Sequence, residues 1–501
     1  CSYNRLNGSH ACDNDWLLNT VLKRDWGFKG FVMSDWGAVP SLSTALHGLD
    51  QQSGAELDPA VFFDKPLAEA AAKDAATKAR LADMNRRVLY AIYANGVDQP
   101  APKSAIDFKA NGDVAEAAAK EGIVLLRNQA GALPLAVSAK RIAVIGGYAD
   151  TGVLSGGGSS QVQGQGGPAL ALPLGGEGMF AGFISQQYHR SSPLKAMKAR
   201  APGTTFAYRD GRYIADAVAA AKQADVAIVF ATQWAAEGID AGDLNLPNGQ
   251  DALIAAVAEA NPHTIVVLET GGPVVMPWLD KTAAVIEAWY PGARGGEAIA
   301  AVLYGDTNPS GRLPVTFPAS VAQLPIPELP GQGTIDPDFQ GRPKGGEALS
   351  LDYSNEGSDV GYRWYARKGL KPLFAFGYGL SYTSFEHSGL SVTSGKAITA
   401  SFTLRNSGAR AGADVAQLYL IAANGKAQLR LAAFEKVSLA AGESKQIGVT
   451  IDPRLLADWK DGSWSIPAGA YSFAIGDDAE HLGPAVTVKM AARNWRDSPL
   501  P

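Results

Sequence analysis

The segment Ile142-Ala143-Val144-Ile145-Gly146-Gly147 is a short apolar run closed by two glycines. Similar runs follow at residues 226–231, 264–268 and 284–288, and helical patterns over 213–223 and 250–260 alternate with them. Near-continuous Val, Ile and Ala runs are typical of parallel strands that are buried on both faces. We therefore predict a doubly wound α/β domain over residues 114–318, preceded by a polar linker at 96–113.

Residues 1–95 also alternate helical and apolar patterns. Helical spacing over Trp16–Leu22 is followed by Phe31-Val32-Met33, which we expect to be a buried strand, and residues 66–95 predict one long helix or two. Ninety-five residues supply two or three β/α units, whereas a closed (β/α)8 barrel takes ~250 residues. The segment is therefore either a small open sheet or the last third of a barrel.

The C-terminal part has a different pattern. Residues 319–358 are rich in Pro, Gly and Asp without periodicity, and we expect a long surface connection there. Residues 359–495 contain short alternating strands, such as 398–404, 415–421, 445–451 and 469–476, separated by turn residues. This pattern predicts an all-β sandwich.

Composition excludes several classes of protein. The chain has 501 residues, of which 46% are hydrophobic and 19% charged, so disorder is excluded as its main state. A net charge of -5 without a basic run argues against nucleic acid as a partner. No apolar stretch reaches the ~18 residues of a membrane span. The six histidines are scattered without paired spacing, so we expect no histidine-based metal site.

The only two cysteines, Cys1 and Cys12, lie close together near the start of the chain. We predict a disulfide between them, with two reduced buried thiols as the alternative. A disulfide fits a secreted or periplasmic protein. The chain opens in the middle of a strand-like pattern and without a signal peptide, and we expect that its beginning is missing.

Two carboxylates follow predicted strands. Asp35 comes directly after Phe31–Met33, with Trp36 beside it as a possible apolar wall against a sugar. Glu237 lies in the loop after strand 226–231. Ligands bind at the carboxyl ends of parallel strands, so both are candidates for a site. The alternatives are a capping Asp at a turn and a solvated surface Glu, with Asp240 and Asp243 competing for the role of Glu237.

The Gly-rich segment Ser155–Ser160 predicts a loop whose amides and hydroxyls approach a ligand closely. It lacks the Gly-Lys-Ser/Thr ending of a phosphate-binding loop, which argues against a nucleotide.

Together these motifs resemble glycoside hydrolase family 3, in particular its three-domain β-glucosidase-type members. The resemblance runs along the whole chain in order and is carried by Ser2-Tyr3-Asn4, Gly27–Val32, Ser34-Asp35-Trp36-Gly37, Glu121–Asn128, Leu133-Pro134-Leu135, Asn308–Pro314, Thr316-Phe317-Pro318 and Phe376–Phe385. It implies three parts: the C-terminal part of a (β/α)8 barrel at 1–95, an α/β sandwich domain at 114–318, and a fibronectin type III-like domain at 359–495.

The resemblance also implies roles for individual residues. Asp35 matches the nucleophile, and Glu237 matches the general acid/base, a position that varies in the family. Trp36 and Tyr3 match residues at the sugar site, and Ser159 matches a loop serine directed into the pocket. The implied activity is that of a retaining, exo-acting β-glucosidase that uses no cofactor and acts on β-linked glucosides or oligosaccharides.

Other readings of the same resemblance remain. The substrate could be that of a β-xylosidase, an exo-β-glucanase or an arabinofuranosidase. Family members carry sugar-gripping residues upstream of the tyrosine motif, and none of these is in the chain. The resemblance thus implies a further partner, an N-terminal barrel segment. Without it the chain would be an inactive carbohydrate-binding fragment.

Overall fold

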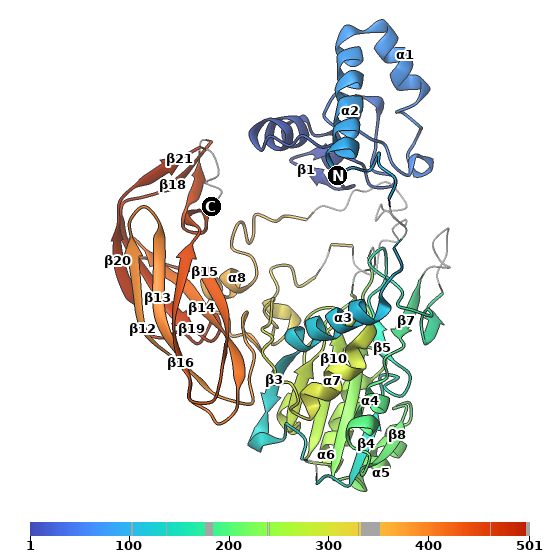
Figure 1. Ribbon diagram of the computed structural model, residues 1–501, viewed down its shortest axis with the longest axis vertical. Helices are drawn as coiled ribbons and strands as arrows, with labels where there is room; N and C mark the ends of the chain where they lie inside the picture. Colours follow the sequence, from blue (N-terminus) through green and yellow to red (C-terminus); the bar gives the residue numbers. More distant parts are fainter. Residues whose placement is uncertain are drawn as a thin grey trace. The chain divides into compact units, whose positions relative to one another are not determined.

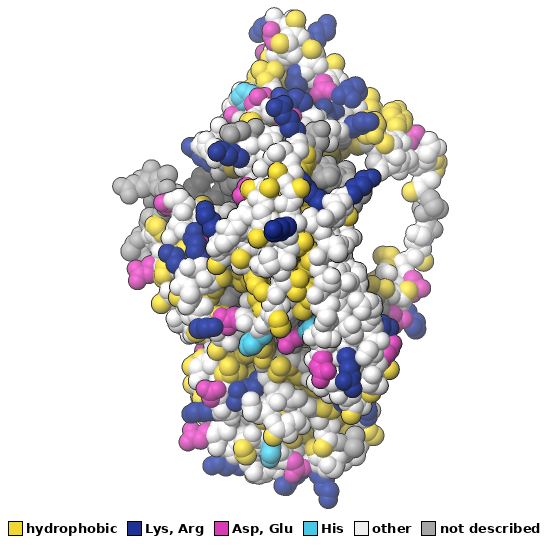
Figure 2. Space-filling model, turned by 90° about the vertical axis from the view of Figure 1, so that its left-hand side faces the viewer, with side chains coloured by type: hydrophobic (Ala, Val, Ile, Leu, Met, Phe, Trp, Pro, Cys, Tyr) yellow, Lys and Arg dark blue, Asp and Glu magenta, His cyan; other side chains and the backbone are white. Residues whose placement is uncertain are grey.

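The computed structural model of the 501-residue chain describes residues 1–101, 104–136, 138–175, 184–237, 239, 241–328, 330–331, 351–460 and 462–496. The chain divides into two compact units, residues 1–106 (unit 1) and 107–501 (unit 2). Figure 1 shows unit 1 in blue, and unit 2 as an α/β part in cyan to yellow followed by a β part in orange and red. Basic and acidic side chains are interspersed over the face seen in Figure 2.

Unit 1 is mostly helical. A short hairpin of β1 (Arg5–Leu6) and β2 (Ser9–His10) precedes a π-helix, η2 (Trp16–Asp25). The Ala-rich stretch forms two helices, α1 (Lys65–Lys73) and α2 (Ala75–Ala94). They separate at Asp74, whose carboxylate accepts the amide proton of Thr77 at 2.7 Å and so caps α2.

The prediction of a buried strand at Phe31–Met33 is wrong. The segment forms a single parallel bridge, between Met33 and Gln51, and the Met33 side chain is 45% exposed. Its neighbour is held by side chains instead: buried Asp50 accepts a hydrogen bond from the Val32 amide at 2.8 Å and pairs with Lys23 and Arg80. A strand needs a ladder of backbone bonds, and in the described part of unit 1 this segment has only that one bridge.

The α/β part of unit 2 is built on a six-stranded sheet. The strand order is β3-β11-β10-β9-β4-β8, and all neighbours are parallel except β3 and β11. The strands are β3 (Val124–Asn128), β4 (Arg141–Ile145), β8 (Thr205–Arg209), β9 (Val226–Gln233), β10 (Thr264–Thr270) and β11 (Ala284–Glu287). The apolar runs therefore predicted β4, β9, β10 and β11 correctly, whereas β3 and β8 were not predicted.

Helices cover both faces of this sheet. Consecutive strand residues such as Val266 and Val267 are fully buried in two different cores, because side chains alternate across a strand. One core is closed by α3 (Phe108–Gly122), α4 (Pro193–Arg200) and α7 (Gly295–Leu303), the other by α5 (Ile214–Lys222) and α6 (Gln250–Ala260). A small antiparallel sheet, β5-β7-β6, adds Val153–Ser155, Ser185–His189 and Leu170–Pro173.

The β part is a sandwich of two antiparallel sheets, β12-β13-β16 and β15-β14-β19-β20. Its strands are β12 (Phe385–Ser394), β13 (Ile398–Asn406), β14 (Gly412–Ala423), β15 (Lys426–Leu439), β16 (Ser444–Ile451), β19 (Gly469–Gly476) and β20 (Val486–Met490). A third sheet joins β17 (Asp458–Lys460), β18 (Ser463–Ile466) and β21 (Arg493–Trp495). The expected connection at 319–358 lies partly outside the described residues; helix α8 (Tyr362–Lys368) follows it.

Candidate active site

Asp35 lies directly after the Met33–Gln51 bridge, and backbone bonds fix its position. Its amide donates to the carbonyl oxygen of Cys1 at 2.9 Å, and its carboxylate accepts the amide proton of Trp36 at 2.8 Å. The preceding Ser34 is buried, and its hydroxyl oxygen accepts a hydrogen bond from the Ser53 amide at 2.9 Å. The Asp35 side chain remains partly exposed.

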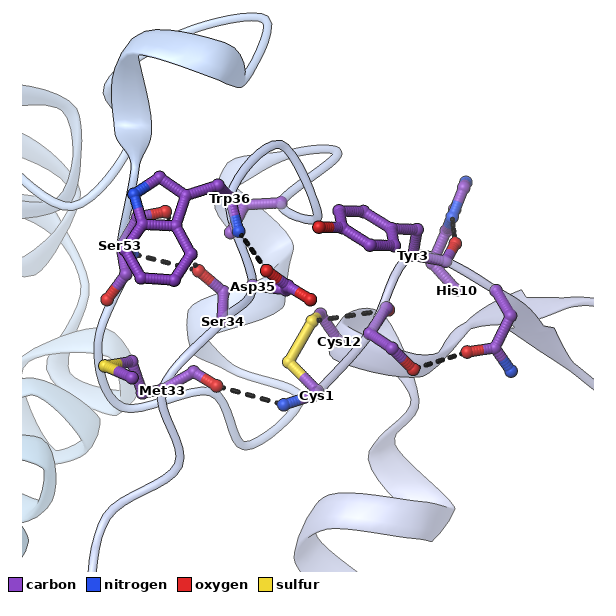
Figure 3. Close-up of a disulfide and its surroundings, with 12 residues drawn as sticks. Cys1, Tyr3, His10, Cys12, Met33, Ser34, Asp35, Trp36 and Ser53 are labelled. Carbon is purple, nitrogen blue, oxygen red and sulfur yellow. Dashed lines mark hydrogen bonds between the residues drawn. A yellow bond between two sulfur atoms is a disulfide. The ribbon is translucent and has the colours of Figure 1, made fainter. Parts of the chain in front are cut away.

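The indole of Trp36 lies against the backbone of Gly54. A Cβ atom added at Gly54 would stand 1.6 Å from Cδ1 of Trp36, and Gly54 has a φ of +57°, a conformation that favours glycine. Trp36 is nevertheless 50% exposed, so one side of its ring stays open next to Asp35 (Figure 3). The geometry provides an apolar wall beside a carboxylate.

Tyr3 and the two cysteines complete this half of the site. Cys1 and Cys12 form a disulfide with a Cα–Cα distance of 5.1 Å, so the chain segment that carries Tyr3 is closed into a ring. Figure 3 shows the partly exposed Tyr3 ring on the side of Asp35, with its hydroxyl directed toward the side of Trp36. Asp35, Trp36 and Tyr3 are thus gathered in unit 1.

Glu237 lies in unit 2, in the loop that follows β9. Its carboxylate accepts a hydrogen bond at 2.7 Å from the amide of Ser159 in the Gly-rich loop, so the structure brings these two predicted residues together. The two loops are also joined by the amide of Gly157, which donates to the carbonyl oxygen of Ala235 at 2.9 Å. Hydrogen bonds from the side chain and backbone of Ser159 lower the pKa of Glu237, because they favour its charged form.

Three consecutive glycines let the loops approach this closely. A Cβ atom at Gly156 would stand 3.0 Å from the ring of Tyr290, and one at Gly157 would stand 2.4 Å from the ring of Trp234. At Gly158, whose φ is +83°, it would stand 2.4 Å from Cβ of Glu237. The space beside each glycine is therefore taken up by a side chain from a neighbouring segment.

The competing carboxylates are placed differently. Asp243 is exposed, and its carboxylate accepts the amide proton of Asn245 at 2.8 Å, which is a local turn contact. Asp240 lies outside the described residues. Glu237 is thus the described carboxylate of this loop that contacts the Gly-rich loop.

Three residues near this loop were missed by the sequence analysis. Glu269 and Glu287 are fully buried at the ends of β10 and β11, and burial raises the pKa of each to about 8. Tyr290 follows β11 and bonds to the loop of Glu237. A carboxylate inside an otherwise apolar strand, as in Ile286-Glu287, was the available signal, because such a group needs a special environment.

In the portion of the chain that the structure describes, no group of three or more His, Cys, Asp or Glu side chains is arranged to hold a metal ion. No helix in that portion combines the length and apolar character of a membrane span.

Comparison with known proteins identifies the family of this chain. Residues 123–382, more than half of the chain, match the glycosyl hydrolase family 3 C-terminal domain, and residues 414–479 match a fibronectin type III-like domain. The chain belongs to glycosyl hydrolase family 3. The family assignment agrees with the resemblance carried by the motifs, and with an α/β part followed by a β-sandwich.

Several glycosidases are similar along nearly all of the chain. The thermostable β-glucosidase B of Acetivibrio thermocellus is 34% identical over 96% of this chain and 62% of its own length. An exo-α-(1→6)-L-arabinopyranosidase of Bifidobacterium longum is 32% identical over 98% of this chain and 63% of its own length. The chain thus spans less than two thirds of these relatives.

A solved β-glucosidase structure is also similar to nearly the whole chain. DesR, a β-glucosidase from Streptomyces venezuelae in complex with D-glucose, matches with a TM-score of 0.84 and 32% identity. The match covers 97% of this chain and 75% of that chain.

Proposed function

We propose that the protein is a retaining, exo-acting β-glucosidase that hydrolyses terminal β-D-glucosyl residues, with Asp35 as nucleophile and Glu237 as general acid/base. The observation that carries the proposal is similarity to β-glucosidases over nearly the whole chain, in a chain that has a carboxylate at both expected positions. Each carboxylate is accessible and accepts at least one backbone hydrogen bond.

The reaction takes two displacements. In the first, a carboxylate oxygen of Asp35 bonds to the anomeric carbon, the bond to the aglycone oxygen breaks, and Glu237 gives that oxygen its proton. In the second, water attacks the anomeric carbon, Glu237 takes its proton, and the bond to Asp35 breaks to release the sugar. The anomeric configuration is retained because it is inverted twice.

Glu237 must be protonated in the first step and charged in the second. The Ser159 hydrogen bonds favour the charged form, which suits the base. A sugar that excludes water from the exposed carboxylate would raise its pKa again, because desolvation disfavours charge. Substrate binding would thus prepare Glu237 as the acid.

In this proposal, Trp36 and Tyr3 bind and orient the sugar. The open side of the Trp36 ring packs on a sugar face, and the Tyr3 hydroxyl lies on the side where it orients Asp35 or the substrate. Ser159 supplies the amide that orients Glu237.

The similarity to an exo-α-(1→6)-L-arabinopyranosidase favours a second candidate substrate, a terminal L-arabinopyranosyl group. The xylosidase, exo-glucanase and arabinofuranosidase alternatives use the same two carboxylates. An aryl glycoside panel separates them, since the preferred sugar gives the highest kcat/KM.

Two further parts of the proposal concern the surroundings of the chain. We propose that additional β/α units of a barrel pack on unit 1, supported by its exposed apolar side chains Trp16, Trp26, Leu89, Tyr93 and Val97. We also propose a secreted or periplasmic location, supported by the Cys1–Cys12 disulfide.

The proposal is tested with an activated 2-deoxy-2-fluoro-β-glucoside, which traps the glycosyl-enzyme. We expect the label on Asp35, and we expect Asp35→Asn to lower kcat on an aryl β-glucoside by at least about 10³-fold. Asp25→Asn is the matched control, because Asp25 is an exposed carboxylate paired with its neighbour Arg24. A label on another residue, or near-normal kcat in Asp35→Asn, would overturn the assignment, and an unreactive full-length protein would favour a binding role.

A further inference from the structure

Tyr290 contacts the loop that carries Glu237 through its hydroxyl group. Its hydroxyl donates to the carbonyl oxygen of Gln233 at 2.6 Å and accepts from the amide of Ala235 at 2.7 Å. These two backbone atoms bracket the turn by which the chain leaves β9 and reaches Glu237. One phenol therefore binds a partly buried carbonyl at the end of β9 and a partly buried amide just beyond it.

The same side chain also touches the Gly-rich loop. The Tyr290 ring lies against Gly156, because a Cβ atom added there would stand 3.0 Å from the ring. On its other side, a Cβ atom at Gly271 would stand 2.7 Å from the hydroxyl oxygen. Tyr290 is thus enclosed by two glycines, and it joins the segment that carries Ser159 to the segment that carries Glu237.

The segment that leads into Tyr290 is fixed by hydrogen bonds. The preceding Trp289 has a left-handed φ of +57°, and its amide donates to the carboxyl of buried Glu287 at 2.8 Å. Thr270 donates to the same carboxyl at 3.0 Å. Burial raises the pKa of Tyr290 to about 12, so its hydroxyl stays a donor over the working range of a glycosidase.

We infer that Tyr290 is a positioning residue for the acid/base: it sets the place of Glu237 by fixing both ends of the Gln233–Ala235 turn. The inference rests on the proposed function of Glu237. Tyr290 need not touch the substrate, and its effect passes through the loop. A displacement of about 1 Å at a catalytic group is enough to cost rate.

The test is Tyr290→Phe in the full-length protein, which keeps the ring and removes the two hydrogen bonds. Tyr378→Phe is the matched control, because Tyr378 is also partly buried in unit 2 and donates to a backbone carbonyl, that of Leu126, at 3.1 Å. Both variants are assayed by kcat/KM on cellobiose, a substrate with a poor leaving group, and on 2,4-dinitrophenyl β-glucoside, which needs no acid. Glu237→Ala is measured alongside.

We expect Tyr290→Phe to lower kcat/KM on cellobiose by about 10- to 100-fold while the dinitrophenyl substrate loses less than about threefold. The ratio of the two values does not depend on how much protein folds, so a lower yield leaves the result readable. Equal losses on both substrates, or a ratio matching that of Tyr378→Phe, would overturn the positioning role.

The two levels of the argument fail separately. If Glu237→Ala loses both substrates equally, the acid/base assignment falls and Tyr290 with it. If Glu237→Ala discriminates between the substrates and Tyr290→Phe does not, only the positioning role falls.

Discussion

The carboxylate of Asp35 accepts a hydrogen bond from the next residue in the chain, whereas that of Glu237 accepts one from a residue 78 positions away. Asp35 stands beyond a single β-bridge in unit 1. Glu237 follows a strand that pairs on both sides within a six-stranded sheet. The two halves of the proposed site therefore depend on different kinds of structure.

This difference separates what each half needs from the fold. The carboxylate of Asp35 is held locally by its neighbour Trp36, while the Asp35 backbone is joined to Cys1 and the Trp36 ring lies against Gly54. The geometry around Glu237 exists only when two distant loops pack together. Changes around Trp36 in unit 1 should thus alter sugar binding, and changes in the loops of unit 2 should alter proton transfer.

After Asp35→Asn, the largest expected effect in this comparison is that of Glu237→Ala. General acid–base catalysis contributes about 10²- to 10⁴-fold, so kcat/KM on cellobiose should fall by that factor. The first step on dinitrophenyl β-glucoside should be spared, because its leaving group departs without a proton. Added azide, which needs no general base, should restore turnover and give a glucosyl azide.

Asp243→Ala provides the control for this experiment, because Asp243 is an exposed carboxylate of the same loop whose contact is a local turn. Equal losses on both substrates without azide rescue would assign Glu237 a structural role. The comparison between the two halves would then break on its unit 2 side.

A smaller effect is expected for Gly54→Ala. The added methyl group would collide with the Trp36 ring, so the indole must move away from its place beside Asp35. We expect kcat/KM to fall by about tenfold, because the displaced indole no longer positions the sugar beside Asp35. The loss should be equal for cellobiose and the dinitrophenyl substrate, since proton transfer is untouched.

Gly96→Ala separates the collision from backbone strain. Gly96 has a φ of +65°, close to that of Gly54, but an added Cβ atom there has no neighbour within 4 Å. If Gly96→Ala loses as much activity as Gly54→Ala, then strain is the cause and Trp36 has no role in binding.

The smallest effect is expected for Ser159→Ala. Removing the hydroxyl takes away a hydrogen bond that lowers the pKa of Glu237, while the backbone amide still donates. The pKa of Glu237 should rise, and because the acid must be protonated, the alkaline limb of the kcat/KM–pH profile should move to higher pH. Ser160→Ala is the control, because the Ser160 hydroxyl donates to the carbonyl oxygen of Gly157 and its loss should leave the alkaline limb in place. A shift of the limb to lower pH in Ser159→Ala would contradict the proposed effect of Ser159 on the pKa of Glu237.

The sequence predicted those parts of the molecule that depend on local patterns. Apolar runs located β4, β9, β10 and β11, because strands buried on both faces need continuous apolar residues. The same rule failed at Phe31–Met33, where Val32 is buried in a small apolar cluster outside a sheet and its amide donates to the carboxylate of Asp50. Asp74 splits the Ala-rich helix through a cap that periodicity alone does not reveal.

The sequence proposed identities for the site residues but not the contacts between them. Resemblance to a family named Asp35 and Glu237, but no pattern joined Glu237 to Ser159, since that pairing is created by the packing of two loops. Tyr290 was invisible for the same reason: a tyrosine after an apolar strand is ordinary, and only its two backbone partners make it special.

The glycines at 156–158 have an evolutionary consequence. Composition alone would class Gly156-Gly157-Gly158 as a flexible spacer in which any small residue is acceptable. Each missing side chain is instead replaced by a ring or a methylene group from elsewhere in the fold, within 3.0 Å of where Cβ would stand. Substitution at Gly157 or Gly158 would therefore require a compensating change in Trp234 or Glu237, and substitution at Gly156 would require the Tyr290 ring to shift. The evolution of this loop is thus coupled to that of the residues it contacts.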